Sequence, residues 1–195
     1  MLDITNFNAP SRLKDIKDAT ASIGFTMSSD QLTGSLLRTL AATKPAGSFL
    51  ELGTGTGHGT AWILDGMDAK SSLITVDIGE HAVSVAKRFL GPDPRVTFVA
   101  MDGIAFIDSM REQRRTFDFI FADMHPGKFR HLEETLQLLA PGGIYIVDDL
   151  LPLPTWEETH ALRVVQFIAT LEQRNELRVT KLNWSTGLLI AVCKM

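Results

Sequence analysis

Short apolar runs alternate with helix-forming stretches through the middle of the chain, and this alternation restricts the fold more than any other feature. The expected strands cover residues 49–52, 73–76, 96–101, 117–122 and 144–147. The expected helices between them cover about 58–66, 80–90, 103–114 and 128–140. Strands that are apolar along their whole length and alternate with helices form parallel sheets covered on both faces. The sequence therefore predicts an α/β, doubly wound fold.

The alternation changes after residue 149. The stretch Thr155-Trp156-Glu157-Glu158 is a capping box that is expected to open a helix running to about residue 174. Two further strands are expected at about 177–182 and 188–193, and the short connection between them forces them to be antiparallel. We predict a mostly parallel, seven-stranded sheet with one antiparallel strand near its C-terminal end.

The chain of 195 residues is expected to form one domain. Residues 1–44 form a helical lead-in and lid in this prediction, and residues 45–195 form the α/β core. The lead-in contains one helix at about 10–21 and a second that a capping box at Ser28 opens. The second helix carries leucines on one face, at Leu32, Leu36, Leu37 and Leu40.

Composition narrows the classes of partner. The 19 Lys and Arg residues against 23 Asp and Glu give a net charge of −4, which argues against a nucleic-acid partner. The single Cys193 cannot form an internal disulfide, which fits a reducing compartment. No hydrophobic leader is visible, and no apolar run approaches the ~20 residues needed to span a bilayer. We expect a cytoplasmic protein without membrane or nucleic-acid partners.

Glycine occupies every second position from Gly53 to Gly59, between the first expected strand and the helix after it. Such glycines allow a tight turn and a close approach to a ligand, and the amides of the helix N-terminus favour an anionic group. A phosphate-binding P-loop is excluded because the loop has no lysine. The dinucleotide pattern G-x-G-x-x-G fails because its third glycine falls on His58 or Thr60.

Asp77 ends the second expected strand, twenty residues after Gly57. A carboxylate at this place can accept both hydroxyls of a ribose. Asp is also a common helix N-cap, so Asp77 indicates a ribose site only in combination with the glycine loop. The two features together predict a ligand that contains a nucleoside.

The pattern E-x-G-x-G-x-G from Glu51 to Gly57 resembles motif I of the class I S-adenosylmethionine-dependent methyltransferases. The resemblance implies a Rossmann-like methyltransferase fold with S-adenosylmethionine as cofactor. It also implies that Asp102 receives the adenine amino group, in addition to capping the helix that begins at Gly103. The residues assigned to the cofactor are Met27, Ser28, Glu51, Gly53, Thr54, Gly55, Gly57, Asp77, Ile78, Asp102, Gly103 and Asp123.

Three carboxylates follow the fourth and fifth expected strands, at Asp123, Asp148 and Asp149. If the two strands are neighbours, their ends lie ~4.8 Å apart and the carboxylates converge. Such a cluster is costly unless it is solvated, partly protonated or neutralised by a cation. Oxygen ligands of this kind suit Mg²⁺, Mn²⁺ or Ca²⁺.

The chain from about Phe25 to Met195 resembles the catechol and caffeoyl-CoA O-methyltransferase group of this class. The resemblance covers the Ser28 capping box, the glycine loop, Asp77, the three carboxylates and the closing strand pair around Trp184 and Gly187. That group binds a divalent metal through an Asp and an Asp-Asn pair, which implies a metal at Asp123, Asp148 and Asp149. Asp149 stands where the group has Asn and adds a negative charge. The group often dimerises, which implies a homodimer.

The position of the catalytic base departs from this group. The group has a lysine three residues after the metal-binding Asp, and this chain has Pro126 there. His125 and Lys128 lie nearby, and with Asp123 they are the candidate catalytic residues. The pKa of a histidine suits a base near neutral pH. We expect Lys128 to lie in the first turn of a helix with a solvated side chain.

The leading hypothesis is methyl transfer to a hydroxyl of a small molecule, a phenol or vicinal diol, assisted by a divalent metal. Two alternatives stay open: a methyltransferase that uses another acceptor without metal, and a cofactor-binding protein without turnover. A nicotinamide dehydrogenase is disfavoured by the glycine spacing and by the lack of a Tyr-x-x-x-Lys pair. The apolar stretch 150–156 would either wall the acceptor pocket or pack on the sheet.

Overall fold

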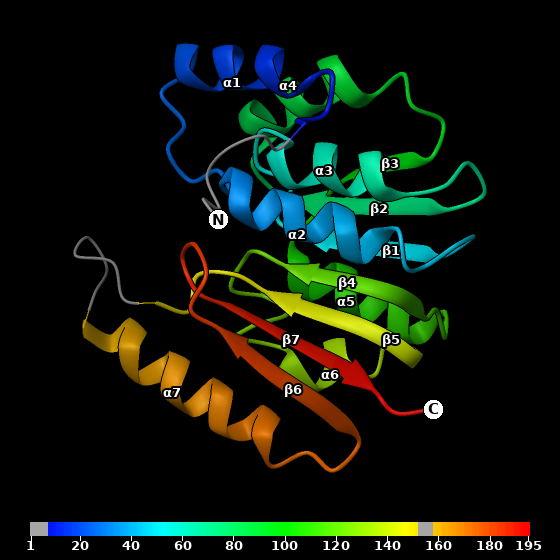
Figure 1. Cartoon of the computed structure of the whole chain (residues 1–195), viewed down its shortest axis with the longest axis vertical. Helices are drawn as coiled ribbons and strands as arrows, with labels where there is room; N and C mark the ends of the chain where they lie inside the picture. The colour runs from blue at the N-terminus through cyan, green and yellow to red at the C-terminus, as the bar shows by residue number, and fades with distance from the viewer. Residues whose placement is uncertain (1–7, 152–157) are drawn as a thin grey trace.

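The computed structural model describes residues 8–151 and 158–195, and its strands form one sheet (Figure 1). The strands are β1 (Ser48–Leu52), β2 (Ser72–Asp77), β3 (Val96–Ala100), β4 (Phe117–Ala122), β5 (Leu139–Val147), β6 (Leu177–Leu182) and β7 (Leu188–Cys193). The helices are α1 (Leu13–Ser22), α2 (Gln31–Ala41), α3 (His58–Gly66), α4 (Glu80–Leu90), α5 (Gly103–Glu112), α6 (Leu132–Leu136) and α7 (Glu158–Glu172).

The sheet has seven strands in the order β3-β2-β1-β4-β5-β7-β6. The first five strands in this order pair in parallel, and β7 pairs antiparallel to both β5 and β6. The predicted fold class is therefore confirmed, including the single antiparallel strand. The order in which the chain adds strands to the sheet reverses between β1 and β4, and sheets of this kind bind ligands at the carboxyl ends of the strands at such a point.

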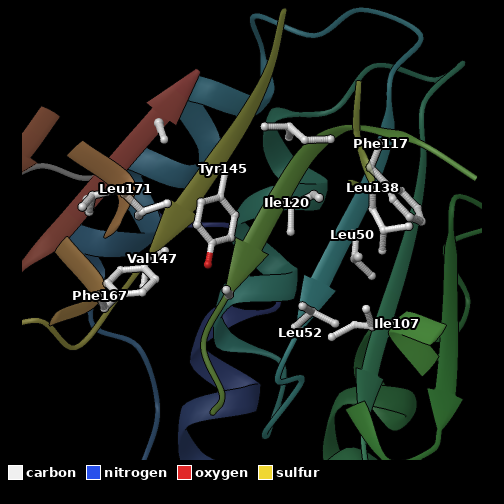
Figure 2. Packing of buried hydrophobic residues seen from close by; sticks show 14 of the residues in the cluster. Leu50, Leu52, Ile107, Phe117, Ile120, Leu138, Tyr145, Val147, Phe167 and Leu171 are labelled. Atoms are coloured by element: carbon white, nitrogen blue, oxygen red, sulfur yellow. The ribbon is translucent and has the colours of Figure 1, made fainter. Parts of the chain in front are cut away.

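Helices cover both faces of the sheet, because side chains of each strand point alternately to the two sides. One face packs against α1 to α4, and its core includes Ile16, Leu37, Ile63, Phe49, Phe119 and Phe121. The other face packs against α5, α6 and α7, and Figure 2 shows Leu50, Ile120 and Tyr145 on it, on neighbouring strands. Tyr145 is fully buried and donates a hydrogen bond to the carbonyl of Gly127.

Two local predictions are wrong. The helix expected over 128–140 is reduced to α6, because the backbone amides of Lys128, Phe129 and Arg130 all donate to the carbonyl of His125. His131 then takes a φ of 55°, in the left-handed region, and β5 already begins at Leu139. These features close residues 125–131 into a compact loop.

The second correction concerns the start of α2. Asp30 caps this helix instead of Ser28, since its carboxylate accepts a hydrogen bond from the Thr33 amide at 2.9 Å. Ser28 instead lies 3.3 Å, hydroxyl to hydroxyl, from Thr56 in the glycine loop. Most of the capping box at 155–158 lies outside the described residues, and α7 is described from Glu158. Within the described part of the chain, no helix is long and apolar enough to cross a membrane.

The contact between α2 and α3 leaves no space at Gly34. A Cβ atom there would lie 2.2 Å from Cδ1 of the buried Trp62, and the guanidinium of Arg38, one turn later in α2, lies over the same ring at 4.9 Å from its centre. We expect Gly34→Ala to lower the free energy of unfolding by about 1–3 kcal/mol, although alanine is the better helix former. Urea unfolding measures the change, with Thr39→Ala on the exposed side of α2 as the control. Equal stability of Gly34→Ala and the wild type would contradict this packing.

Candidate functional site

The candidate site lies along the carboxyl ends of the parallel strands. Leu52 of β1 pairs with Val76 of β2 on one side and with Ala122 of β4 on the other. Ala122 in turn pairs with Val147 of β5. Each of these paired residues is followed at once by a predicted site residue. The register therefore brings the glycine loop, Asp77, Asp123 and Asp148 to one edge.

The glycine loop needs glycine for conformation and for space. Gly53 has a φ of 106°, and a Cβ atom there would lie 2.8 Å from the carbonyl oxygen of Asp123. Gly57 has a φ of 91°, and its Cβ would lie 2.8 Å from the methyl group of Ala86 in α4. Side chains rarely adopt such φ values, so the loop can approach both a ligand and β4 only because it is built from glycine.

Asp77 holds the glycine loop from the end of β2. One carboxylate oxygen accepts a hydrogen bond from the Gly55 amide at 2.8 Å, and the other accepts from the Gly79 amide at 2.8 Å. The next residue, Ile78, is 67% exposed, and Met27 is 77% exposed. An exposed apolar side chain such as Ile78 next to the carboxylate of Asp77 suits a ligand with an aromatic base and a ribose.

Asp102 performs the capping role expected of it. Its carboxylate oxygen Oδ1 accepts hydrogen bonds from the amides of Ile104 and Ala105 at 3.0 and 3.1 Å, at the start of α5. The side chain is exposed, so it can also meet a ligand. Gly103 is buried and packs against the side chains of Met124 and Pro126.

Glu51 and Thr54, which the resemblance assigns to the cofactor, are buried under the glycine loop and do not reach the surface. Glu51 is 1% exposed, and its carboxylate accepts hydrogen bonds from the hydroxyls of Thr60 and Thr75 at 2.5 and 2.7 Å. Burial raises the pKa of Glu51 to about 7. Thr54 is 4% exposed and lies 2.6 Å from the Thr75 hydroxyl. These residues form a polar layer beneath the glycine loop.

Asp123 lies directly against the glycine loop. Its amide donates to the carbonyl of Leu52 at 2.8 Å, and its carboxylate accepts a hydrogen bond from the Ser29 hydroxyl at 2.9 Å. Burial, then repulsion from Asp148 and Asp149, raises the pKa of Asp123 well above its usual range.

The neighbouring Asp148 is almost fully buried. One of its carboxylate oxygens accepts hydrogen bonds from the Thr186 hydroxyl at 2.5 Å and from the Asp149 amide at 2.7 Å. Burial raises the pKa of Asp148 to about 6. Asp149 has a φ of 65°, in the left-handed region. The predicted metal ligands are thus neighbours, but among the described residues no group of three or more His, Cys, Asp or Glu side chains is placed to hold a metal ion.

Lys128 is buried, in contrast to the solvated position expected from the sequence. Its side chain is 3% exposed, and its ammonium nitrogen donates to the carbonyl oxygen of Asp148 at 2.8 Å. The ammonium also lies 5.3 Å from the centre of the Phe129 ring. Sequence reasoning missed this placement because it assumed a helix over these residues.

His125 lines a hollow of about 490 Å³ beneath α7, together with Lys128, Arg163 and Phe167. Its ring packs edge-on against Phe129 at 5.6 Å. Burial and the nearby charge of Lys128 lower the pKa of His125. No described contact joins His125 to Asp123. His58 is the first residue of α3, as expected, and burial lowers its pKa to about 4.

Sequence reasoning also missed the hydroxyls that hold the carboxylates. Ser29 bonds to Asp123 from 94 residues away, and Thr186 bonds to Asp148 from 38 residues away. Ser29 belongs to the Ser28 capping box, but that motif does not predict its contact with Asp123, and no local motif marks Thr186. The stretch 150–156 is described only at Leu150 and Leu151, whose amides donate to the carbonyls of Gly187 and Thr186. Its predicted role as a pocket wall falls mostly outside the described residues.

Residues 50–150 match the family described as a methyltransferase domain. A protein of Arabidopsis thaliana named provisionally as a caffeoyl-CoA O-methyltransferase is 26% identical over 71% of this chain and 63% of its own length. An O-methyltransferase, also named provisionally, of Mycolicibacterium vanbaalenii is 32% identical over 58% of this chain and 52% of its own length. The chain thus spans about half to three fifths of these relatives.

Solved structures share the fold over almost the whole chain. The O-methyltransferase of Bacillus cereus in complex with SAH superposes with a TM-score of 0.82 at 20% identity, covering 94% of this chain and 91% of the other. The O-methyltransferase TomG of Streptomyces achromogenes in complex with SAM gives 0.81 at 19% identity, covering 95% and 90%. These likenesses confirm the predicted architecture.

The buried carboxyl of Glu51 makes stability depend on pH. Its pKa rises from 4.5 to about 7 on folding, so the native state holds a proton that the unfolded state releases in this range. This group therefore lowers the stability of the wild type by up to about 3 kcal/mol as the pH rises through that window. We expect Glu51→Gln to remove this loss, measured by urea unfolding at several pH values. Glu112→Gln, on the exposed end of α5, should show the same change of unfolding free energy with pH as the wild type. The same pH dependence in Glu51→Gln would contradict the assignment of the loss to Glu51.

Proposed function

The chain belongs to the methyltransferase domain family, and we propose that it transfers the methyl group of S-adenosylmethionine to a hydroxyl of a small molecule. The observation that carries the proposal is the junction of the glycine loop with Asp77 on one side and Asp123 on the other. This junction supports a nucleoside site beside a carboxylate that can accept a proton. The relatives and neighbours that are named as O-methyltransferases support the choice of oxygen as the acceptor atom.

The cofactor is proposed to lie across the carboxyl ends of β1 and β2. Gly53 and Gly55 expose backbone groups of the glycine loop to the cofactor. The carboxylate of Asp77 accepts hydrogen bonds from the ribose hydroxyls. Met27 and Ile78 would cover the adenine, since both are apolar and exposed. Burying them under a base would remove apolar surface from water, which favours binding. Asp102 would accept from the adenine amino group at the end of β3.

Methyl transfer from a sulfonium is an in-line displacement, so positioning supplies much of the rate. The acceptor oxygen forms a bond to the methyl carbon while the bond from carbon to sulfur breaks and S-adenosylhomocysteine leaves. The carboxylate of Asp123, which lies against the glycine loop, accepts the proton of the acceptor hydroxyl. Ser29 fixes the orientation of that carboxylate. A phenol or vicinal diol is the proposed acceptor class, because a phenolic proton is acidic enough for a carboxylate to assist.

The first test concerns the cofactor. Calorimetry should show that the purified chain binds S-adenosylhomocysteine but not NAD. Asp77→Ala should weaken this binding about 10- to 100-fold, because a charged acceptor of hydrogen bonds is lost. Glu112→Ala, far from the edge on α5, is the matched control and should bind as the wild type does. Binding of NAD without any response to S-adenosylhomocysteine would overturn the assignment.

The second test separates binding from transfer. Asp123→Asn keeps the shape of the side chain and can still accept from Ser29, so binding of S-adenosylhomocysteine should stay within a few-fold of the wild type. Turnover of a phenol or catechol should fall by about 10²-fold or more, because the amide cannot take the proton. Formation of S-adenosylhomocysteine reports the rate. Full turnover by Asp123→Asn would show that Asp123 does not take the proton. If the wild type binds the cofactor but turns over no acceptor, the chain is a binding protein and not an enzyme.

A further inference from the structure

The acidic edge of the site carries a charge that the protein must balance. Asp123 and Asp148 follow the paired residues Ala122 and Val147, and Asp149 is next in the chain. Asp148 is 2% exposed. Carboxylates that are close together and shielded from water repel one another and lose hydration, so an unbalanced cluster is costly. A positive charge at this edge would stabilise it.

Lys128 supplies a positive charge from within the chain. Its ammonium group is buried and bonds to the main-chain carbonyl of Asp148 at 2.8 Å. The same charge lowers the pKa of both Asp123 and Asp148, against the stronger effect of their burial. A buried ammonium without acidic neighbours would itself be unfavourable. The lysine and the carboxylates therefore compensate for one another.

The loop that carries Lys128 is built to hold it there. Gly127 has a φ of 86°, and a Cβ atom at this position would lie 2.4 Å from a methyl group of Leu52. The carbonyl of Gly127 accepts the hydroxyl of Tyr145 in the core, and Pro126 forms a bridge with Arg130. The backbone of the loop is thus fixed against β1 and β5. Lys128 points into the edge as a consequence of this backbone and not through free rotation at the surface.

The residues present do not fit a resident divalent metal. Thr186 and the Asp149 amide already occupy one oxygen of Asp148. A divalent ion beside the Lys128 ammonium would meet a like charge in surroundings that screen it weakly. The departures seen in the sequence agree with this geometry, because Pro126 replaces the expected lysine and Lys128 appears two positions later.

We propose that the ammonium group of Lys128 is the built-in cation of this edge and takes the place of a divalent metal. The positive charge would balance Asp123 and Asp148 and would favour negative charge that develops on the acceptor oxygen. This role deepens the proposed function and rests on it for the acceptor. The charge balance itself rests only on the folded chain.

The decisive measurement is titration with Mn²⁺ alone, followed by calorimetry and thermal unfolding, since an ion that binds the native state stabilises it. The wild type should show no saturable binding at millimolar Mn²⁺. Lys128→Met keeps the apolar stem and removes the charge, and it should bind Mn²⁺ at least about tenfold more tightly than the wild type. The double variant with Asp148→Ala should lose this gain. Lys128→Arg and Arg130→Ala, the latter an exposed cation on the same loop, should behave as the wild type.

The wild-type titration decides the matter even if Lys128→Met fails to fold. Saturable binding of one Mn²⁺ to the wild type, lost in Asp148→Ala, would overturn the proposal and make a divalent ion the resident cation. Failure of Lys128→Met, when folded, to gain affinity would also overturn it. These readouts need no turnover, so they are separate from the tests of methyl transfer. Where turnover is found, the wild type should retain it in excess EDTA, and loss of turnover there that Mn²⁺ restores would contradict the proposal.

Discussion

The pairing of β1 with β4 is the constraint on which the site depends. Leu52 and Ala122 are the last paired residues of these strands, and the amide of Asp123 continues the ladder by donating to the carbonyl of Leu52. This pairing places Gly53 against the backbone of Asp123, where a Cβ atom on the glycine would lie 2.8 Å from the carbonyl oxygen of Asp123. A shift of one residue in this register would turn Asp123 to the opposite face of the sheet.

Much of this arrangement could be predicted from the sequence because it depends on local pattern. The bounds of α3, α4, β4, β6 and β7 agree with the expected ranges, since periodicity and glycine breaks define them. The burial of Glu51 also had a signal: it shares strand parity with Phe49, so it faces α3 and not the solvent. Lys128 had none, because its place depends on how residues 125–131 close on the carbonyl of His125. A homodimer and a cytoplasmic location stay predictions.

The segment between α1 and α2 connects the parts of the site across large sequence distances. Ser28 contacts Thr56 in the glycine loop, Ser29 bonds to Asp123, and Asp30 accepts from Ser185 in the turn between β6 and β7. Phe25 lies over Gly55. The expectation that residues 1–44 form a helical lead-in and lid stays a prediction. The hydrogen bonds of the segment between α1 and α2 link the glycine loop, the acidic edge and the turn between β6 and β7. A displacement of one of these parts would therefore disturb the contacts of the others.

The position of β7 has a consequence for how the protein is made. The last strand along the chain lies between β5 and β6, so β6 has no partner in the sheet until residues 188–193 are available. During synthesis the edge of β5 stays unpaired while α7 and β6 emerge. An unpaired strand edge can form hydrogen bonds with another chain. Thr186, which orients Asp148, arrives in the same late step. The acidic edge is therefore completed only when the final strand inserts, and a nascent chain that lacks this strand is the form most exposed to aggregation and to capture by chaperones.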